Sequence, residues 1–104
     1  MKILCCCAHG YKRSAQMRRL LLYSGHDPIT IGVEKNSADT IAYLSAWADV
    51  ILLAEPTMIK KIPTRFQKRI DDRFTVGPDD FEPIRMDQRL VNIVKGQLKN
   101  LKYI

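Results

Sequence analysis

The sequence contains little cysteine and histidine, and neither is spaced for a structural bridge or a metal site. The three cysteines are consecutive, at positions 5–7, so they cannot close long loops as a disulfide framework does. This favours a reducing compartment. His9 and His26 stand alone, and no second cysteine cluster supplies the separated ligand pairs that structural zinc needs. We therefore expect no disulfide framework and no structural metal.

Long apolar runs and low-complexity stretches are also missing. The longest apolar stretches, residues 3–8 and 50–54, are far shorter than the roughly 20 residues that span a bilayer. The N-terminal segment lacks the small-residue cleavage site of a secretory signal. No repeat or Pro/Gly-rich linker divides the 104 residues, a length that can bury one modest core. We expect a single cytoplasmic domain over residues 1–104, without a membrane partner.

Acidic residues are outnumbered, with 11 Asp and Glu against 17 Lys and Arg, which gives a formal charge of +6. Much of the excess lies in residues 12–19 and 60–73. The ordinary interpretation of such segments is a solvated face, and a docking surface is the alternative for the second one. Positive charge favours anionic partners in general. A nucleic acid partner is compatible with this charge but is not favoured.

Short apolar runs alternate with longer amphipathic segments along the chain. The apolar runs predict strands at residues 2–6, 29–33, 50–54 and 73–76. The amphipathic segments predict helices over 14–24, after Ser37 or Asp39, over 56–69 with a kink or break at Pro63, and over 87–101. Such alternation implies parallel pairing through right-handed crossovers. The predicted fold is an α/β three-layer sandwich with a four-stranded parallel sheet of order 2-1-3-4 and helices on both faces.

The segment from Cys7 to Ser14 carries the strongest chemical signal. Cys7 follows the first strand, five residues separate it from Arg13, and Arg13-Ser14 opens a helix. Such a loop can curl around a tetrahedral oxyanion with its N–H groups and the helix N-terminus directed inward, while Arg13 grips two oxygens. The same positive field lowers the pKa of a cysteine thiol, and Ser14 can donate to the sulfur. Composition alone would give roughly 0.01 such matches by chance.

The preceding cysteines have a different interpretation. Side chains alternate across a strand, so Cys5 and Cys6 point to opposite faces, and free cysteine is commonly buried. We expect both to be core residues. The same interpretation of Cys7, with Arg13 as a surface charge, is the alternative to the oxyanion loop.

The loop resembles the low molecular weight protein tyrosine phosphatase family, together with residues 47–53, Trp-Ala-Asp-Val-Ile-Leu-Leu, and residues 78–81, Pro-Asp-Asp-Phe. The short bacterial and phage-type branch is the most similar. The resemblance implies that Cys7 is the nucleophile, that Arg13 binds phosphate, that Asp79 protonates the leaving oxygen, and that no cofactor takes part. Asp80 stands where the family often has proline and is the competing acid. The implied substrate-binding residues are Ala8, His9, Gly10, Tyr11, Lys12, Ser14, Asp80 and Phe81.

Several loop residues depart from the family pattern. Where the family commonly has Gly, Asn, Cys and Pro, this chain has His9, Gly10, Lys12 and Ala15. Gly10 can adopt the left-handed conformation that Asn tolerates. Lys12 replaces a cysteine that can protect the nucleophile by forming a disulfide. These departures keep a second function open, that of a catalytically weak or inactive phosphatase fold that binds phosphorylated or polyanionic partners.

The favoured function is a phosphomonoester hydrolase acting through a phosphocysteine, on a phosphotyrosine protein or a small phosphomonoester. Arsenate reductases use a similar loop but need a later resolving cysteine, and none follows Cys7. The cysteine-phosphorylated carrier domain of sugar phosphotransferase systems is similar at residues 48–53. It generally lacks the loop arginine and the aspartate motif, so Arg13 and Asp79 argue against it.

Overall fold

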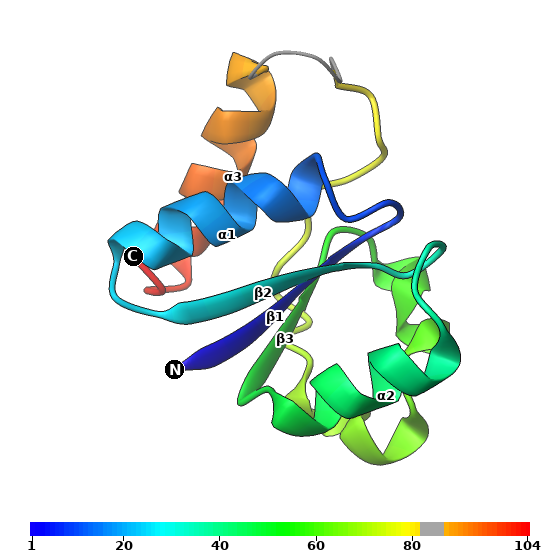
Figure 1. Cartoon of the computed structure of the whole chain (residues 1–104). Coiled ribbons are helices and arrows are strands. Elements are labelled where there is room, and N and C mark those ends of the chain that lie inside the picture. Colours follow the sequence, from blue (N-terminus) through cyan, green and yellow to red (C-terminus); the bar gives the residue numbers. More distant parts are fainter. Residues whose placement is uncertain (82–86) are drawn as a thin grey trace.

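The computed structural model describes residues 1–81 and 87–104, which form an α/β fold around a parallel sheet (Figure 1). Its strands are β1 (Lys2–Cys7), β2 (Asp27–Gly32) and β3 (Val50–Leu53), in the order β2-β1-β3. The α-helices are α1 (Arg13–Tyr23), α2 (Ala38–Trp47) and α3 (Gln88–Asn100), and two 3₁₀ segments are η1 (Pro56–Lys61) and η2 (Thr64–Arg69). None of the helices in these two described stretches is long and apolar enough to cross a membrane.

Helices cover both faces of the sheet. Helices α1 and α3 lie on one face and α2 lies on the other (Figure 1). The strand order explains this arrangement, because the chain moves outward from β1 to β2 and then returns past β1 to β3. Right-handed crossovers in opposite directions place their helices on opposite faces.

The central strand β1 is buried because the sheet is covered on both sides. Its residues from Ile3 to Cys7 are at most 2% exposed, so the prediction that Cys5 and Cys6 belong to the core is confirmed. Burial, and secondarily the neighbouring Cys7, raises the pKa of Cys5 to about 12. Burial likewise raises the pKa of Cys6. Both therefore remain neutral thiols.

Local capping and proline chemistry set the helix boundaries. Ser37, rather than Asp39, caps α2, because its hydroxyl accepts the N–H of Thr40 at 3.2 Å. The predicted break at Pro63 is confirmed, since η1 ends at Lys61 and η2 begins at Thr64. The sequence predicts a helix over residues 56–69, but the segments before and after the break are short 3₁₀ helices and not α-helix.

The predicted strand at residues 73–76 is wrong, and with it the sheet order 2-1-3-4. Ile70 makes an isolated parallel bridge with Ile51, and the N–H of Asp71 donates to the Ile51 carbonyl at 3.0 Å. A turn then closes between Asp71 and Phe74. Backbone hydrogen bonds resume just after β3, where the N–H groups of residues 76 and 77 donate to the Ala54 carbonyl. The turn thus interrupts the pairing that a fourth strand would make with β3, and two separate backbone contacts remain, one at Ile51 and one at Ala54.

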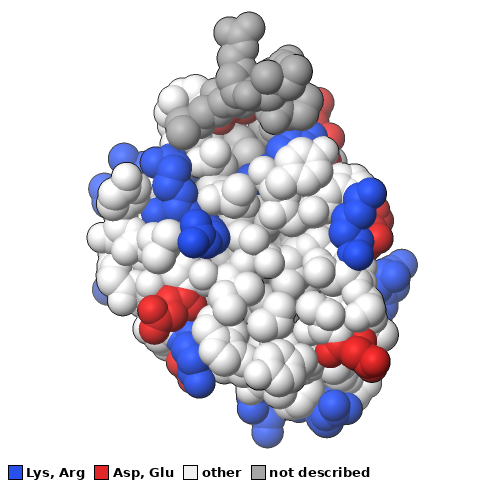
Figure 2. Space-filling model, viewed as in Figure 1, with Lys and Arg blue, Asp and Glu red and all other residues white. Residues whose placement is uncertain are grey.

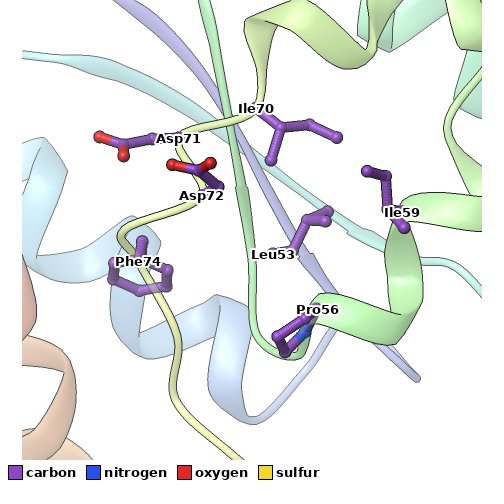
Figure 3. A pocket seen from close by; sticks show the side chains of 7 residues that line it. All are labelled: Leu53, Pro56, Ile59, Ile70, Asp71, Asp72 and Phe74. Atoms are coloured by element: carbon purple, nitrogen blue, oxygen red, sulfur yellow. The ribbon is translucent and has the colours of Figure 1, made fainter.

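This departure from the sheet leaves an apolar hollow between β3 and η1. Figure 3 shows the side chains of Leu53, Ile59 and Ile70 pointing into it, while the carboxylate of Asp71 points away. Asp71 is held by Tyr103, whose hydroxyl donates at 2.6 Å, and by two hydrogen bonds from the Arg73 guanidinium. None of the residues that line the hollow belongs to the loop after β1.

Candidate active site

The loop after β1, residues 8–12, lies directly on the end of β2. The N–H of Val33 donates to the Cys7 carbonyl at 2.8 Å, and the N–H of Glu34 donates to the Ala8 carbonyl at 3.0 Å. Two glycines permit this approach. Gly10 has φ +83°, and a Cβ there would lie 2.8 Å from the N of Gly32. A Cβ on Gly32 would lie 2.4 Å from the carbonyl carbon of His9. Larger residues at either position would push the loop off the strand.

The sulfur of Cys7 is buried within a group of hydrogen-bond donors. Sγ lies 3.1 Å from Ser14 Oγ, and the N–H of Gly10 donates to it at 3.1 Å. Burial alone raises the pKa of this thiol. Hydrogen bonds from the side chain and backbone of Ser14, and from the backbone of Gly10 and His9, outweigh burial and lower the pKa below its ordinary value. The environment therefore favours a thiolate, in contrast to that of Cys5 and Cys6.

Arg13 turns into the fold and is only 1% exposed. Its Nη1 donates to Glu55 Oε2 at 2.9 Å and to the Gly77 carbonyl at 2.7 Å. Within residues 1–81 and 87–104, Nη2 and Nε have no hydrogen-bond partner. An arginine anchored through one nitrogen keeps two others available, which is what bidentate recognition of an oxyanion requires. This contradicts the alternative in which Arg13 is a surface charge.

Glu55 is a site residue that sequence reasoning missed. It follows β3 and contributes the carboxylate that neutralises Arg13. Its signal in the sequence was a charged residue directly after a buried strand. Loops that follow parallel strands meet at one edge of the sheet, where Arg13 also lies.

The Asp79 carboxylate is brought to the loop by Lys12. Lys12 Nζ lies 2.7 Å from Asp79 Oδ1 and donates to the Phe81 carbonyl at 3.3 Å. Asp80 is exposed, and its backbone carbonyl accepts a hydrogen bond from Arg89 Nη2 at 3.0 Å. Of the two candidate acids, Asp79 is therefore the one whose side chain contacts the loop.

The remaining predicted residues form the rim and its support. The rings of His9 and Tyr11 stack with their centroids 6.0 Å apart, and Tyr11 is 57% exposed. Ala8 and Phe81 are partly buried against the core, and the guanidinium of Arg89 lies 5.5 Å from the centre of the Phe81 ring. The loop thus carries two stacked, exposed rings.

Comparison of the chain with protein-family models, curated proteins and solved structures yields no match in any of the three. The family resemblance therefore rests on residues 7–14, 47–53 and 78–81 of this chain.

Proposed function

We propose that this chain is a cytoplasmic phosphomonoester hydrolase of the low molecular weight protein tyrosine phosphatase type. The observation that carries the proposal is the environment of Cys7. A buried sulfur would ordinarily have a raised pKa, yet donors from Ser14, Gly10 and His9 lower it. A core cysteine has no need of such donors, whereas a nucleophile does.

In the first step the Cys7 thiolate attacks the phosphorus of the substrate. A sulfur–phosphorus bond forms, the bond from phosphorus to the ester oxygen breaks, and Asp79 gives its proton to that oxygen. The free Nη2 and Nε of Arg13 and the inward N–H groups of the loop stabilise the charge on the non-bridging oxygens. Asp79 must be protonated before this step, so its carboxylate has to take up a proton and give up its ion pair with Lys12.

In the second step a water molecule hydrolyses the phosphocysteine. Asp79, now a carboxylate, accepts the proton of the water as its oxygen bonds to phosphorus. The sulfur–phosphorus bond breaks, and inorganic phosphate leaves. The hydroxyl of Ser14, 3.1 Å from Sγ, stabilises the sulfur as it regains its negative charge. The cycle consumes one phosphomonoester and one water molecule and regenerates the Cys7 thiolate, so no cofactor enters this proposal.

The burial of the sulfur and the exposed ring of Tyr11 in the same loop support a substrate class. A buried sulfur favours a phosphate carried on a long flat side chain, and the exposed ring of Tyr11 offers a stacking surface for it. Phosphotyrosine in a protein satisfies both conditions, and small aryl phosphates do so as well.

The test is turnover of p-nitrophenyl phosphate and of a phosphotyrosine peptide by matched variants. Cys7→Ser should abolish both activities. Asp79→Asn should slow turnover of the peptide by roughly 10²–10⁴-fold, because tyrosine is the poorer leaving group and depends more on the acid. Asp80→Asn is the matched control and should change little. Acid quenching of wild type during turnover should trap phosphate on the Cys7 peptide.

Cys7→Ser with the activity of wild type would refute the mechanism. The second function is that of a phosphate-binding protein that is weak or inactive in catalysis. It is favoured by the ion pair with Lys12, which holds Asp79 as a carboxylate without a proton to donate. It predicts no turnover by wild type, together with binding of inorganic phosphate that Arg13→Met abolishes.

A further inference from the structure

The segment from Pro56 to Ile70 contains five basic residues and no acidic one. It comprises η1 and η2. Arg69 is used internally, because its Nη1 donates to the carbonyls of Ser45, Ala46 and Ala48 where α2 ends. The other four are exposed and form no ion pair within the part of the chain that the structure describes: Lys60, Lys61, Arg65 and Lys68. We call these four residues the basic surface.

Two residues of the basic surface, Lys60 and Lys61, adjoin the candidate active site. A hollow lined by Lys60 and Lys61 is also lined by Ala8 of the loop and by Glu55, the partner of Arg13. Glu34 contributes the other carboxylate of this hollow. Because Glu55 is engaged with Arg13, the two lysines leave the hollow with a positive balance. A chain that placed a phosphate in the loop could therefore continue across this hollow onto η1.

Basic side chains occur in several places on the molecule. Figure 2 shows a face whose centre carries no charged side chain, with Lys and Arg at several places toward its margin and Asp and Glu among them. Other basic residues are neutralised within the fold, such as Arg73 by Asp71 and Lys12 by Asp79. Lys60 and Lys61, which form no ion pair within the described residues, lie beside the site, and their charge matches a partner that carries negative charges.

The chemistry of this surface favours carboxylates over nucleic acid. Proteins that bind single-stranded nucleic acid stack bases on open aromatic rings. The segment has one aromatic residue, Phe66, and both neighbouring guanidinium groups lie on it, that of Arg65 at 4.6 Å and that of Arg69 at 5.0 Å from its centre. Within this segment, therefore, no aromatic ring is left open for a base. Ammonium and guanidinium groups alone suffice to bind carboxylates.

We propose that the basic surface binds acidic residues that flank the phosphorylated residue of a protein substrate. This inference rests on the proposed function, and it narrows the substrate class to acidic phosphoproteins. The surface acts on binding and not on the chemical step, since none of its residues contacts Cys7, Arg13 or Asp79 in the described structure.

The test compares two phosphotyrosine peptides, one flanked by Glu and Asp and the other by Gln and Asn. Binding to the Cys7→Ser protein is measured by fluorescence anisotropy, so the result does not depend on turnover. The acidic peptide should bind about tenfold more tightly at low salt, as expected from a few exposed ion pairs, and the preference should fade as salt is added.

The variant Lys60→Gln/Lys61→Gln/Lys68→Gln should remove the preference. The matched control Lys95→Gln/Lys99→Gln/Lys102→Gln removes the same charge from α3 and the C-terminal segment, and it should retain the preference. Both triple variants, made with Cys7 intact, should hydrolyse p-nitrophenyl phosphate at the wild-type rate.

Equal binding of the two peptides by the Cys7→Ser protein, or equal loss of preference in both triple variants, would overturn the inference. Tight binding of single-stranded RNA that the η1 and η2 variant alone loses, without a peptide preference, would assign the surface to nucleic acid instead. Failure of the proposed function gives a different result, because wild type would then not hydrolyse p-nitrophenyl phosphate whichever peptide binds.

Discussion

Replacement of Gly32 by Ala tests how closely the loop must lie on β2. The added Cβ would stand 2.4, 2.6 and 2.8 Å from three backbone atoms of His9. Non-bonded carbon atoms prefer about 3.5–4.0 Å, so the loop would have to retreat by roughly 1 Å. Overpacking of this kind costs about 1–3 kcal/mol of unfolding free energy.

The retreat should also change the chemistry of Cys7. The N–H of Gly10 reaches the sulfur at 3.1 Å, and a shift of roughly 1 Å would take it out of hydrogen-bond range. Losing donors that favour the thiolate raises the pKa of Cys7. At neutral pH, Gly32→Ala should therefore react more slowly with iodoacetamide than wild type does, and it should hydrolyse p-nitrophenyl phosphate more slowly.

Gly96→Ala is the matched control for this experiment. Gly96 lies within α3, and a Cβ there would meet no atom within 4 Å. The same substitution should stabilise the protein by about 0.5–1 kcal/mol, since alanine is the better helix former, and should leave alkylation unchanged. Urea unfolding measures the stability change of each variant, and the rate of alkylation by iodoacetamide is measured separately. If Gly32→Ala unfolds at the wild-type midpoint and is alkylated at the wild-type rate, the inferred geometry of the loop is wrong.

Three further predictions concern single side chains. Ser14→Ala should raise the pKa of Cys7, which shifts the pH dependence of iodoacetamide alkylation to higher pH; an unchanged profile would exclude Ser14 as a donor. Glu55→Gln should lower the unfolding free energy by about 1–3 kcal/mol in urea, because the buried Arg13 charge loses its counter-charge. The hydrogen bonds from Arg73 lower the pKa of Asp71, so its carboxylate stabilises the fold above about pH 4 and this contribution disappears at lower pH. Asp71→Asn should therefore be less stable at neutral pH and lose less stability than wild type on acidification.

The sequence predicted the parts of the fold that depend on local patterns. Three of the four strands, the capping of α2 and the break at Pro63 follow from apolar runs and from the chemistry of serine and proline, and the structure contains all of them. The fourth strand failed because residues 73–76 make backbone hydrogen bonds to the β3 side of the sheet only at one end, where the N–H of residue 76 donates to the Ala54 carbonyl. Whether an edge segment pairs along its whole length depends on the turn that precedes it, and the apolar pattern does not specify that turn.

The candidate site divides in the same way. The spacing of Cys7, Arg13 and Ser14 indicated an oxyanion loop, and the structure brings the sulfur and the hydroxyl to 3.1 Å. The partners of Arg13 and Lys12 come from segments more than 40 residues away, Glu55 at 42 positions along the chain and Asp79 still further. Long-range ion pairs depend on how loops converge at the sheet edge, so a single sequence could indicate the region but not the pairing.

Of the three consecutive cysteines, only one is expected to react with thiol reagents in the native protein. Burial raises the pKa of Cys5 and Cys6 and keeps them protonated, while hydrogen bonds lower the pKa of Cys7 at the end of β1 and activate it. Stoichiometric labelling should accordingly modify one sulfur per chain in buffer and three in strong denaturant. An oxidant such as peroxide would meet a single activated sulfur, that of Cys7. Cys6 faces the opposite side of β1, whereas Cys5 faces the same side as Cys7, so Cys5 is the internal thiol on the side of a sulfenic acid formed at Cys7.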